Sequence, residues 1–239
     1  MTQGVYSAGA AMARIELLQE VTANNLANAA TTGFRRDLVT AREAGAGEPG
    51  ITRGPLRLGR VETAVMLDGG AIEPTGGRGD LAIRGEGFFV VEKDGESFLT
   101  RAGSFTRNAN GELTSASGER LMGESGPITV ESDEFTVSPN GEVSVAGATV
   151  NTVRLANTKP GAVLRKAGEG RLEMPADGEA AAPADSSILQ GFLEGSNVSA
   201  IREMVTLVEA FRSYQANSKS IMTADELLDS AVNQVGRVA

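Results

Sequence analysis

The chain contains neither cysteine nor histidine in its 239 residues. Without these side chains it cannot build a Cys/His zinc site, a thiol nucleophile or a histidine-based catalytic triad. The lack of cysteine also excludes disulfides. These absences exclude only the kinds of site that need cysteine or histidine. As separate expectations, we predict no metal site, no cofactor and no enzymatic activity.

Aromatic residues and positive charge are also scarce. Tryptophan is absent, aromatic residues make up 4% of the chain, and glycine is abundant at 30 residues, which favours a β-rich body with many turns. The 31 acidic residues outnumber the 22 basic ones, giving a net charge of -9. Such a charge repels a phosphate backbone and gives no attraction to anionic lipid, so nucleic acid is excluded as an expected partner.

Long apolar runs are missing too. No stretch of about 18 apolar residues is present, so we expect no membrane insertion. The first residues, MTQGVYSAGAAMARIELLQE, show no basic leader followed by an apolar core. If the protein leaves the cytosol, we expect it to do so without a cleavable signal peptide.

The first residues do show the periodicity of an amphipathic helix, from about Ser7 to about Asn28. Thr31, Thr32 and Gly33 are predicted to end it, because glycine readily takes a left-handed conformation. The predicted stripe, widened by Met12, Val21 and Leu26, consists of Ala8, Ala11, Ile15, Leu18, Thr22, Asn25 and Ala29.

A longer helix is predicted at the other end, from Asn197 to about Val235, with Ser196 and Asn197 as candidate N-caps. Alone in water such helices are marginal, so we expect both stripes to be ordered by packing against partners. The predicted stripe consists of Ile201, Met204, Val208, Phe211, Gln215, Ser218 and Met222, continued by Ile221 and Leu228.

Amide side chains interrupt both stripes. Asn25 follows Leu18 by seven residues and Gln215 follows Val208 by seven, so both occupy seam positions. A buried amide there costs stability but fixes helix register, because a slipped alignment leaves it unpaired. Asn24 and Asn28 either share this role or face solvent near a fraying helix end.

The middle of the chain has a sequence pattern typical of β-hairpins. Short β-branched or aromatic runs are separated by turn dipeptides at 94–95, 110–111, 117–118 and 140–141. The fold class is predicted as α+β, with long N- and C-terminal helices that form a coiled-coil-like layer, and with a central Gly-rich antiparallel β body. The expected segments are an axial helix and exit turn (1–36), an extended connector (37–80), a central β domain (81–193) and a second axial helix (194–239).

Three other function classes are weaker interpretations. Residues 77–82 match a dinucleotide-binding fingerprint, but a strand is predicted after them, and that motif needs a helix. Glu86 beside GFFVV is the best candidate for a catalytic carboxylate in a wall-cutting enzyme, but a solvated turn position is the favoured interpretation of this residue. A surface adhesin or wall-binding module that uses the β body is the other alternative.

Three stretches carry a family resemblance: ANNLANAATTGFRRDL (23–38), LAIRGEGFFVV with LTRAGSFTRNANGELTSASGERLMG (81–123), and EGSNVSAIREMVTLVEAFRSYQANSKSIMTADELLDSAVN (194–233). In this order they resemble the signature regions of the bacterial flagellar rod and hook protein family. The resemblance does not separate a proximal or middle rod subunit from a distal one.

The resemblance implies a structural subunit of the flagellar basal-body rod, in the part that crosses the periplasm. Its partners would be copies of itself and other rod proteins in a hollow, torque-transmitting tube, together with the flagellar type III export apparatus. Combined with the helical stripes, it gives an expected assembly interface of Ile15, Leu18, Asn24, Asn25, Leu26, Asn28, Ile201, Met204, Val208, Phe211, Tyr214, Gln215, Asn217, Ile221 and Leu228.

Overall fold

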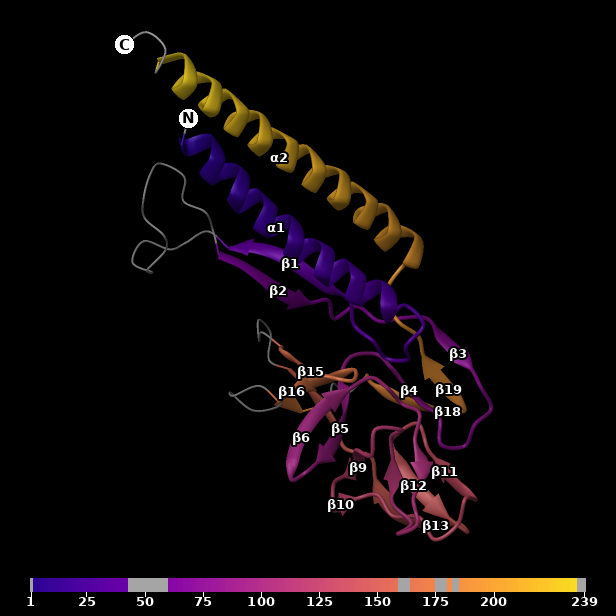
Figure 1. The fold of residues 1–239 in the computed structure, drawn as a ribbon. Helices are drawn as coiled ribbons and strands as arrows, with labels where there is room; N and C mark the ends of the chain where they lie inside the picture. Colours follow the sequence, from indigo (N-terminus) through magenta and orange to yellow (C-terminus); the bar gives the residue numbers. More distant parts are fainter. Residues whose placement is uncertain (1, 43–59, 159–163, 175–179, 182–184, 236–239) are drawn as a thin grey trace. The chain divides into compact units, whose positions relative to one another are not determined.

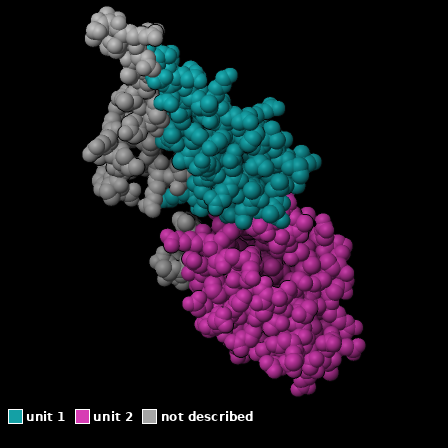
Figure 2. Space-filling view, in the orientation of Figure 1, with its two compact units in different colours: residues 1–27, 37–63, 199–239 teal, residues 28–36, 64–198 magenta. Residues whose placement is uncertain are grey.

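The computed structural model describes residues 2–42, 60–158, 164–174, 180–181 and 185–235. The α+β class is confirmed, since two helices accompany a set of mostly antiparallel strands. The chain forms two compact units (Figure 2): residues 1–27, 37–63 and 199–239 in unit 1, and residues 28–36 and 64–198 in unit 2. These boundaries differ from the expected segments, because residues 28–36 and much of the connector belong to the β body.

Unit 1 consists of two long helices and a small sheet. The helices lie side by side and run in opposite directions, so that the first residues of α1 lie at the same end of the pair as the last residues of α2 (Figure 1). Strand β1 lies along the first helix and pairs with β2, whose last two residues fall in unit 2. The elements are α1 (Thr2–Ala27), β1 (Asp37–Arg42), β2 (Arg60–Val65) and α2 (Ala200–Val235).

The helix ends differ in detail from the prediction. The first helix starts five residues before Ser7, and Gly33 lies in a turn six residues after its last residue. Gly33 does adopt the left-handed conformation, with φ of 68°. A Cβ there would lie 2.2 Å from the backbone nitrogen of Ala102, so glycine is required by close packing as well as by φ.

The second helix starts at Ala200, three residues after the predicted start. The carbonyl of Ser199 accepts the first helical hydrogen bond, from the backbone N–H of Glu203 at 3.0 Å. The predicted N-cap role of Asn197 is therefore wrong, and its side chain bonds instead to backbone groups of unit 2, as described below.

Unit 2 is the β body. Its largest sheet has ten strands, with β15, β16, β6, β5, β9, β8 and β7 in that order and with β10, β14 and β17 added at β9 and β5. A three-stranded sheet follows the order β11, β12, β13, and two further pairs join β18 to β4 and β19 to β3. The paired strands of these sheets run antiparallel.

The strands of unit 2 begin before the predicted β domain, with β3 in the expected connector. In chain order they are β3 (Ile72–Pro74), β4 (Leu81–Arg84), β5 (Phe88–Lys93), β6 (Glu96–Thr100), β7 (Thr106–Arg107), β8 (Leu113–Thr114), β9 (Arg120–Gly123), β10 (Gly126–Pro127), β11 (Phe135–Val137), β12 (Glu142–Val145), β13 (Ala148–Thr152), β14 (Leu155–Asn157), β15 (Lys166–Gly168), β16 (Arg171–Glu173), β17 (Ala180–Ala181), β18 (Ser187–Gln190) and β19 (Phe192–Glu194).

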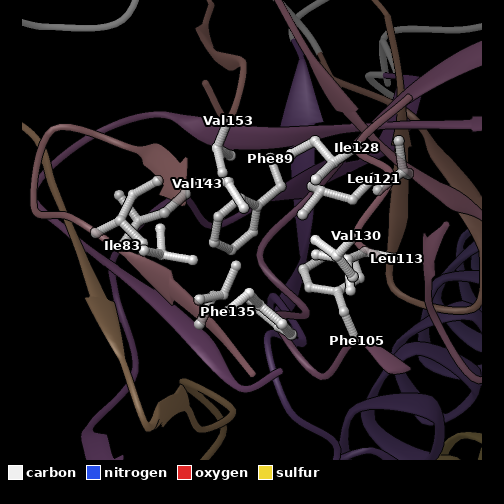
Figure 3. Close-up of a cluster of buried hydrophobic side chains, with 14 residues drawn as sticks. Ile83, Phe89, Phe105, Leu113, Leu121, Ile128, Val130, Phe135, Val143 and Val153 are labelled. Carbon is white, nitrogen blue, oxygen red and sulfur yellow. The ribbon is translucent and has the colours of Figure 1, made fainter. Parts of the chain in front are cut away.

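Strand β5 explains the run FFVV. Successive side chains of a strand point to opposite faces. Phe89 and Val91 therefore enter one buried cluster, while Phe88 and Val90 enter a second one on the other face. The first cluster gathers side chains from several sheets, and in it the rings of Phe89 and Phe105 meet edge to face, with centroids 5.7 Å apart (Figure 3).

The predicted hairpin turns are confirmed. Asp94 and Gly95 join β5 to β6 with φ of 54° and 85°, the left-handed pair that a tight hairpin requires. The dipeptide at 110–111 lies between the paired strands β7 and β8, the one at 117–118 between β8 and β9, and the one at 140–141 between β11 and β12. Each of these turns therefore pairs two strands that are consecutive in the sequence.

Candidate assembly interface

The two helices of unit 1 pack through a heptad-like seam. Their buried and half-buried residues recur at alternating spacings of four and three, which is the pattern of helices that pack nearly in line. We call this set the inner seam. It consists of Ala11, Ile15, Leu18, Thr22 and Asn25 on α1, and of Glu203, Leu207, Ala210, Tyr214, Asn217 and Ile221 on α2.

The predicted stripe of α2 is not the inner seam. Ile201 is 78% exposed, Met204 and Val208 are each 52% exposed, and Phe211 is 55% exposed. Gln215 is exposed as well, so its expected role as a buried seam amide is wrong for the single chain. We call this set of exposed residues, extended by Met222, the outer stripe.

The expected interface residues thus divide into two groups. Ile15, Leu18, Asn25, Tyr214, Asn217 and Ile221 lie in the inner seam, where the chain covers them itself. The remainder of the α2 set lies in the outer stripe, and Leu26 of α1 is half-buried. The side chain of Leu228 lies outside the described residues.

Asn25 has a role that differs from its prediction. It is 1% exposed. Its Nδ2 donates to the carbonyl of Asp37 at 2.9 Å, and its Oδ1 accepts from the N–H of Asp37 at 2.8 Å. The prediction that this amide fixes register between helices is therefore wrong. It satisfies both backbone groups at the start of β1, and so holds the chain reversal that follows α1.

The two neighbouring amides behave differently. Asn24 is exposed. Asn28 is half-buried in the turn after α1, where its Oδ1 accepts a hydrogen bond from Thr31 Oγ1 at 3.2 Å and its carbonyl accepts from the N–H of Thr31 at 3.1 Å. Asn28 therefore shapes the turn.

A groove opens on one side of the helix pair, between the two helices. Its volume is about 620 Å³, and its floor is largely apolar. One wall belongs to α1 and the other to α2, so a bound helix would touch both. The lining residues are Glu16, Gln19, Glu20 and Ala23 of α1, and Leu207, Val208 and Phe211 of α2.

Sequence reasoning missed a buried charge cluster in unit 2. Glu194, 1% exposed, lies between Arg35 and Arg101. Its Oε1 is 2.7 Å from Nη1 of Arg35, an ion pair without directed hydrogen-bond geometry, and its Oε2 accepts from Nη1 of Arg101 at 3.0 Å. The N–H of Gly70 also donates to Oε1 at 2.9 Å. We call these three charged side chains the Glu194 cluster.

Arg101 is a buried cation whose pKa and hydrogen bonds reflect its surroundings in this cluster. Burial lowers the pKa of Arg101 from its ordinary value, the Glu194 carboxylate opposes that shift, and the charge of Arg35 adds to it. Arg101 also donates to the carbonyls of Ile83 and Gly85. The hydrogen bonds explain how the protein keeps a guanidinium buried.

Asn197 completes the same region of unit 2. Its Oδ1 accepts from the N–H of Arg36 at 2.7 Å, and its Nδ2 donates to the carbonyl of Asp68 at 2.9 Å. Three segments that are far apart in sequence, around residues 36, 68 and 197, are thereby joined by one side chain. The sequence EGSNVS predicts a helix cap at Asn197, and no neighbouring residue in the sequence indicates these hydrogen-bond partners.

The weaker candidates gain no support from the geometry. The fingerprint at 77–82 runs into strand β4 rather than a helix, as predicted. Glu86 is exposed, and its Oε2 accepts from Nδ2 of Asn157 at 3.3 Å. No cluster of acidic residues suited to a metal ion occurs within the described part of the chain. Neither of the helices that the structure describes contains an apolar stretch long enough to cross a membrane.

Comparison with protein families gives three matches in chain order. Residues 6–35 match the family described as flagella basal body rod protein, and residues 82–145 match the flagellar hook protein FlgE/F/G D1 domain. Residues 189–235 match the flagellar basal body rod FlgEFG protein C-terminal family. The first and last matches cover most of α1 and α2, and the middle one lies in the β body.

Individual relatives match along nearly the whole chain. The chain is 34% identical to the flagellar basal-body rod protein FlgG of Agrobacterium fabrum, over 87% of this chain and 90% of the relative. It is 32% identical to FlgF of Caulobacter vibrioides, over 92% of both chains. It is also 32% identical to FlgF of Salmonella typhimurium, over 95% of both.

Proposed function

Because this chain belongs to the flagellar basal-body rod protein family and is a structural subunit of the rod, we propose that it polymerises through its terminal helices. The observation that carries this proposal is the outer stripe of α2. Four large apolar side chains there, Ile201, Met204, Val208 and Phe211, are each more than half exposed. A contiguous exposed apolar surface of this kind marks an interaction site.

The proposed assembly is a hollow tube with the helices forming a coiled-coil-like inner layer. The inner seam holds α1 against α2 within a subunit, and the outer stripe is then free to contact a neighbour. A contact between two different surfaces of successive copies does not close, and therefore builds a helical tube. Many such contacts around the tube would share the torque that a rotating shaft carries.

Copies of this chain and other rod proteins are the proposed neighbours. The family resemblance also supports export by the flagellar type III apparatus and a position in the rod segment that crosses the periplasm. Because the role is one of assembly, we propose no enzymatic activity.

The relatives include both FlgF and FlgG, so the position along the rod is a separate question. We propose a proximal or middle position, like that of FlgF, because the 239-residue length and the segments TTGFRRDL and IREMVTLVEA resemble that member. Expressing the chain in strains that lack either FlgF or FlgG tests this. Motility restored only in the strain without FlgG would assign it to the distal rod instead.

The interface is tested by placing charge on the outer stripe. In the double variant Val208→Asp with Phe211→Asp, both side chains are already exposed, so the purified subunit should keep its helix content and its urea unfolding curve. Burying two carboxylates between neighbours is costly, so rods should not form and swimming should be lost. Electron microscopy of isolated basal bodies and swimming assays measure these outcomes.

Val150→Asp is the matched control, because Val150 is 45% exposed and belongs to strand β13 of the β body rather than to a helix. That variant should assemble and swim normally. Complete rods built from the Val208→Asp, Phe211→Asp subunit would refute assembly through the outer stripe.

A further inference from the structure

Arg35 is the least satisfied member of the Glu194 cluster. Its side chain is 2% exposed, yet its Nε, Nη1 and Nη2 atoms form no hydrogen bond with any residue that the structure describes. A guanidinium carries five N–H donors and keeps its charge in proteins. Buried donors without acceptors cost stability, so Arg35 needs an acceptor beyond those that the described residues supply.

Arg101 also leaves one donor unused. Its Nη1 donates to Glu194 and to the carbonyl of Ile83, and its Nη2 donates to the carbonyl of Gly85. Its Nε is buried and has no partner in the described part of the chain. The ring of Phe88 covers one face of the guanidinium, with Cζ 5.3 Å from the ring centroid. The unused donor points along the guanidinium plane, the direction from which anions bind arginine.

The cluster has an excess of one positive charge. The two guanidinium groups lie at the two oxygens of a single carboxylate, that of Glu194. Burial lowers the pKa of Arg101, the Glu194 carboxylate raises it, and the charge of Arg35 lowers it again. Glu86 raises that pKa too, but its influence is the weakest of these, and its side chain is exposed to water.

We propose that the Glu194 cluster binds one small monovalent anion, for which chloride is the probe, between Arg35 and Arg101. Such an ion accepts hydrogen bonds from several N–H groups at once, and its single charge balances the excess of the cluster. Water would supply acceptors without the charge. A divalent anion such as sulfate would carry one charge too many.

The bound anion would stabilise the β body where its first and last segments meet. Arg35 follows the turn after α1, and Glu194 is the last residue of β19. The N–H of Gly33 donates to the backbone carbonyl of Glu194 at 2.7 Å, which holds these two segments together. An unfolded chain does not keep the two arginines adjacent, so the anion binds only the folded state and favours it by mass action.

The chloride dependence of urea unfolding tests the site in the full chain. Chloride is exchanged for gluconate, a monovalent anion too bulky for a buried site, so that the ionic strength stays constant. Once the site fills, each further tenfold rise in chloride should lower the unfolding equilibrium constant nearly tenfold at a fixed urea concentration. Identical unfolding curves in the two salts would overturn the proposal and leave water as the acceptor.

Arg35→Met tests whether the response comes from this cluster. The substitution keeps a long, unbranched side chain, removes the unpaired donors and leaves one guanidinium for one carboxylate. Its unfolding should no longer respond to chloride. Arg78→Met is the matched control, because the Arg78 side chain is 58% exposed, and it should respond as the unaltered protein does. An equal response in all three proteins would mean that chloride acts elsewhere, and the proposal would be wrong.

Crystals grown with bromide give a measurement that needs no variant. Bromide carries the charge of chloride, and its anomalous scattering identifies it. We expect a bromide ion in contact with Arg35 and with Nε of Arg101. A water molecule at that place would overturn the proposal, as would a bromide ion without a chloride response in solution, which would be an adventitious ion only. None of these outcomes bears on assembly through the helices, because all three charged residues belong to unit 2.

Discussion

Glu194 shows how one side chain can hold together a region that no local pattern predicts. Two guanidinium groups share its carboxylate, and the side chains of Glu194, Arg35 and Arg101 are 2%, 2% and 6% exposed. In the described structure the cluster carries two positive charges against one negative charge. Removing the carboxylate would leave two like charges buried side by side, and so the cluster should be intolerant of neutral substitution.

Glu194→Gln is predicted to destabilise the protein strongly. An uncompensated buried charge costs about 3–5 kcal/mol of unfolding free energy, and here two cations lose their shared partner. Urea unfolding of the purified full chain, followed by circular dichroism, measures the change.

Glu134→Gln is the control for that prediction. Glu134 pairs with Arg78 at 3.7 Å, but its side chain is 81% exposed. A surface pair of this kind contributes at most about 1 kcal/mol. If the two variants unfolded at the same urea concentration, the Glu194 cluster would have no special role in stability.

Two asparagines illustrate what an amide can do that a carboxylate or a hydroxyl cannot do as well. Asn25 accepts and donates at the two backbone groups of Asp37, and Asn197 accepts from one segment while donating to another. An amide carries a donor and an acceptor on one rigid group. Both residues were singled out from the sequence, and both have backbone partners rather than the roles expected for them.

At the scale of the element, α2 carries two stripes, and most residues of the outer stripe directly follow a residue of the inner seam in the sequence. The inner seam contains small or polar residues such as Ala210 and Asn217, and the outer stripe contains Val208 and Phe211. Periodicity selects the more apolar stripe, but α1 covers the other one. A buried alanine permits close approach of the helices, which explains why the less apolar face can form the intrachain contact.

The phase of the inner seam is tested by enlarging a residue within it. Ala210 is 4% exposed, so Ala210→Leu should overpack the helix pair and destabilise unit 1 by about 1–3 kcal/mol. Thermal unfolding followed by the helical circular dichroism signal measures this. Ala216→Leu makes the same change at an exposed position of α2 and should alter the midpoint little. A larger shift for Ala216→Leu would mean that the helices pack on another face.

For the whole molecule, the relevant fact is that the chain passes between its two units four times, at residues 27/28, 36/37, 63/64 and 198/199. Three of those passes adjoin segments that Asn197 or its neighbours bind within unit 2. Hydrogen bonds within the β body thus fix the residues that directly precede β1 and the segment that leads into α2.

Removing residues 200–239 tests the independence of the β body. The truncated chain keeps every residue of unit 2, including both hydrophobic clusters and the Glu194 cluster. It should unfold cooperatively in urea with a β-type circular dichroism spectrum, while rod assembly is lost because α2 is missing. A gradual, non-cooperative transition would show that the β body depends on the helices.

The sequence by itself determined the features that arise from neighbouring residues. Helical periodicity placed both terminal helices to within a few residues, and turn dipeptides placed the hairpins. Composition excluded Cys/His zinc sites, thiol nucleophiles and histidine triads. The motifs in chain order identified the family before any geometry was known.

Tertiary structure alone decided which face of α2 packs against its own chain, what Asn25 and Asn197 bind, and where Glu194 finds its two arginines. These depend on residues more than ten positions away, and in the case of Arg35 and Glu194 on opposite ends of the chain. A local pattern measures only the intrinsic preference of a segment. The free energy of burying a charge or an amide depends on the partners that folding brings to it.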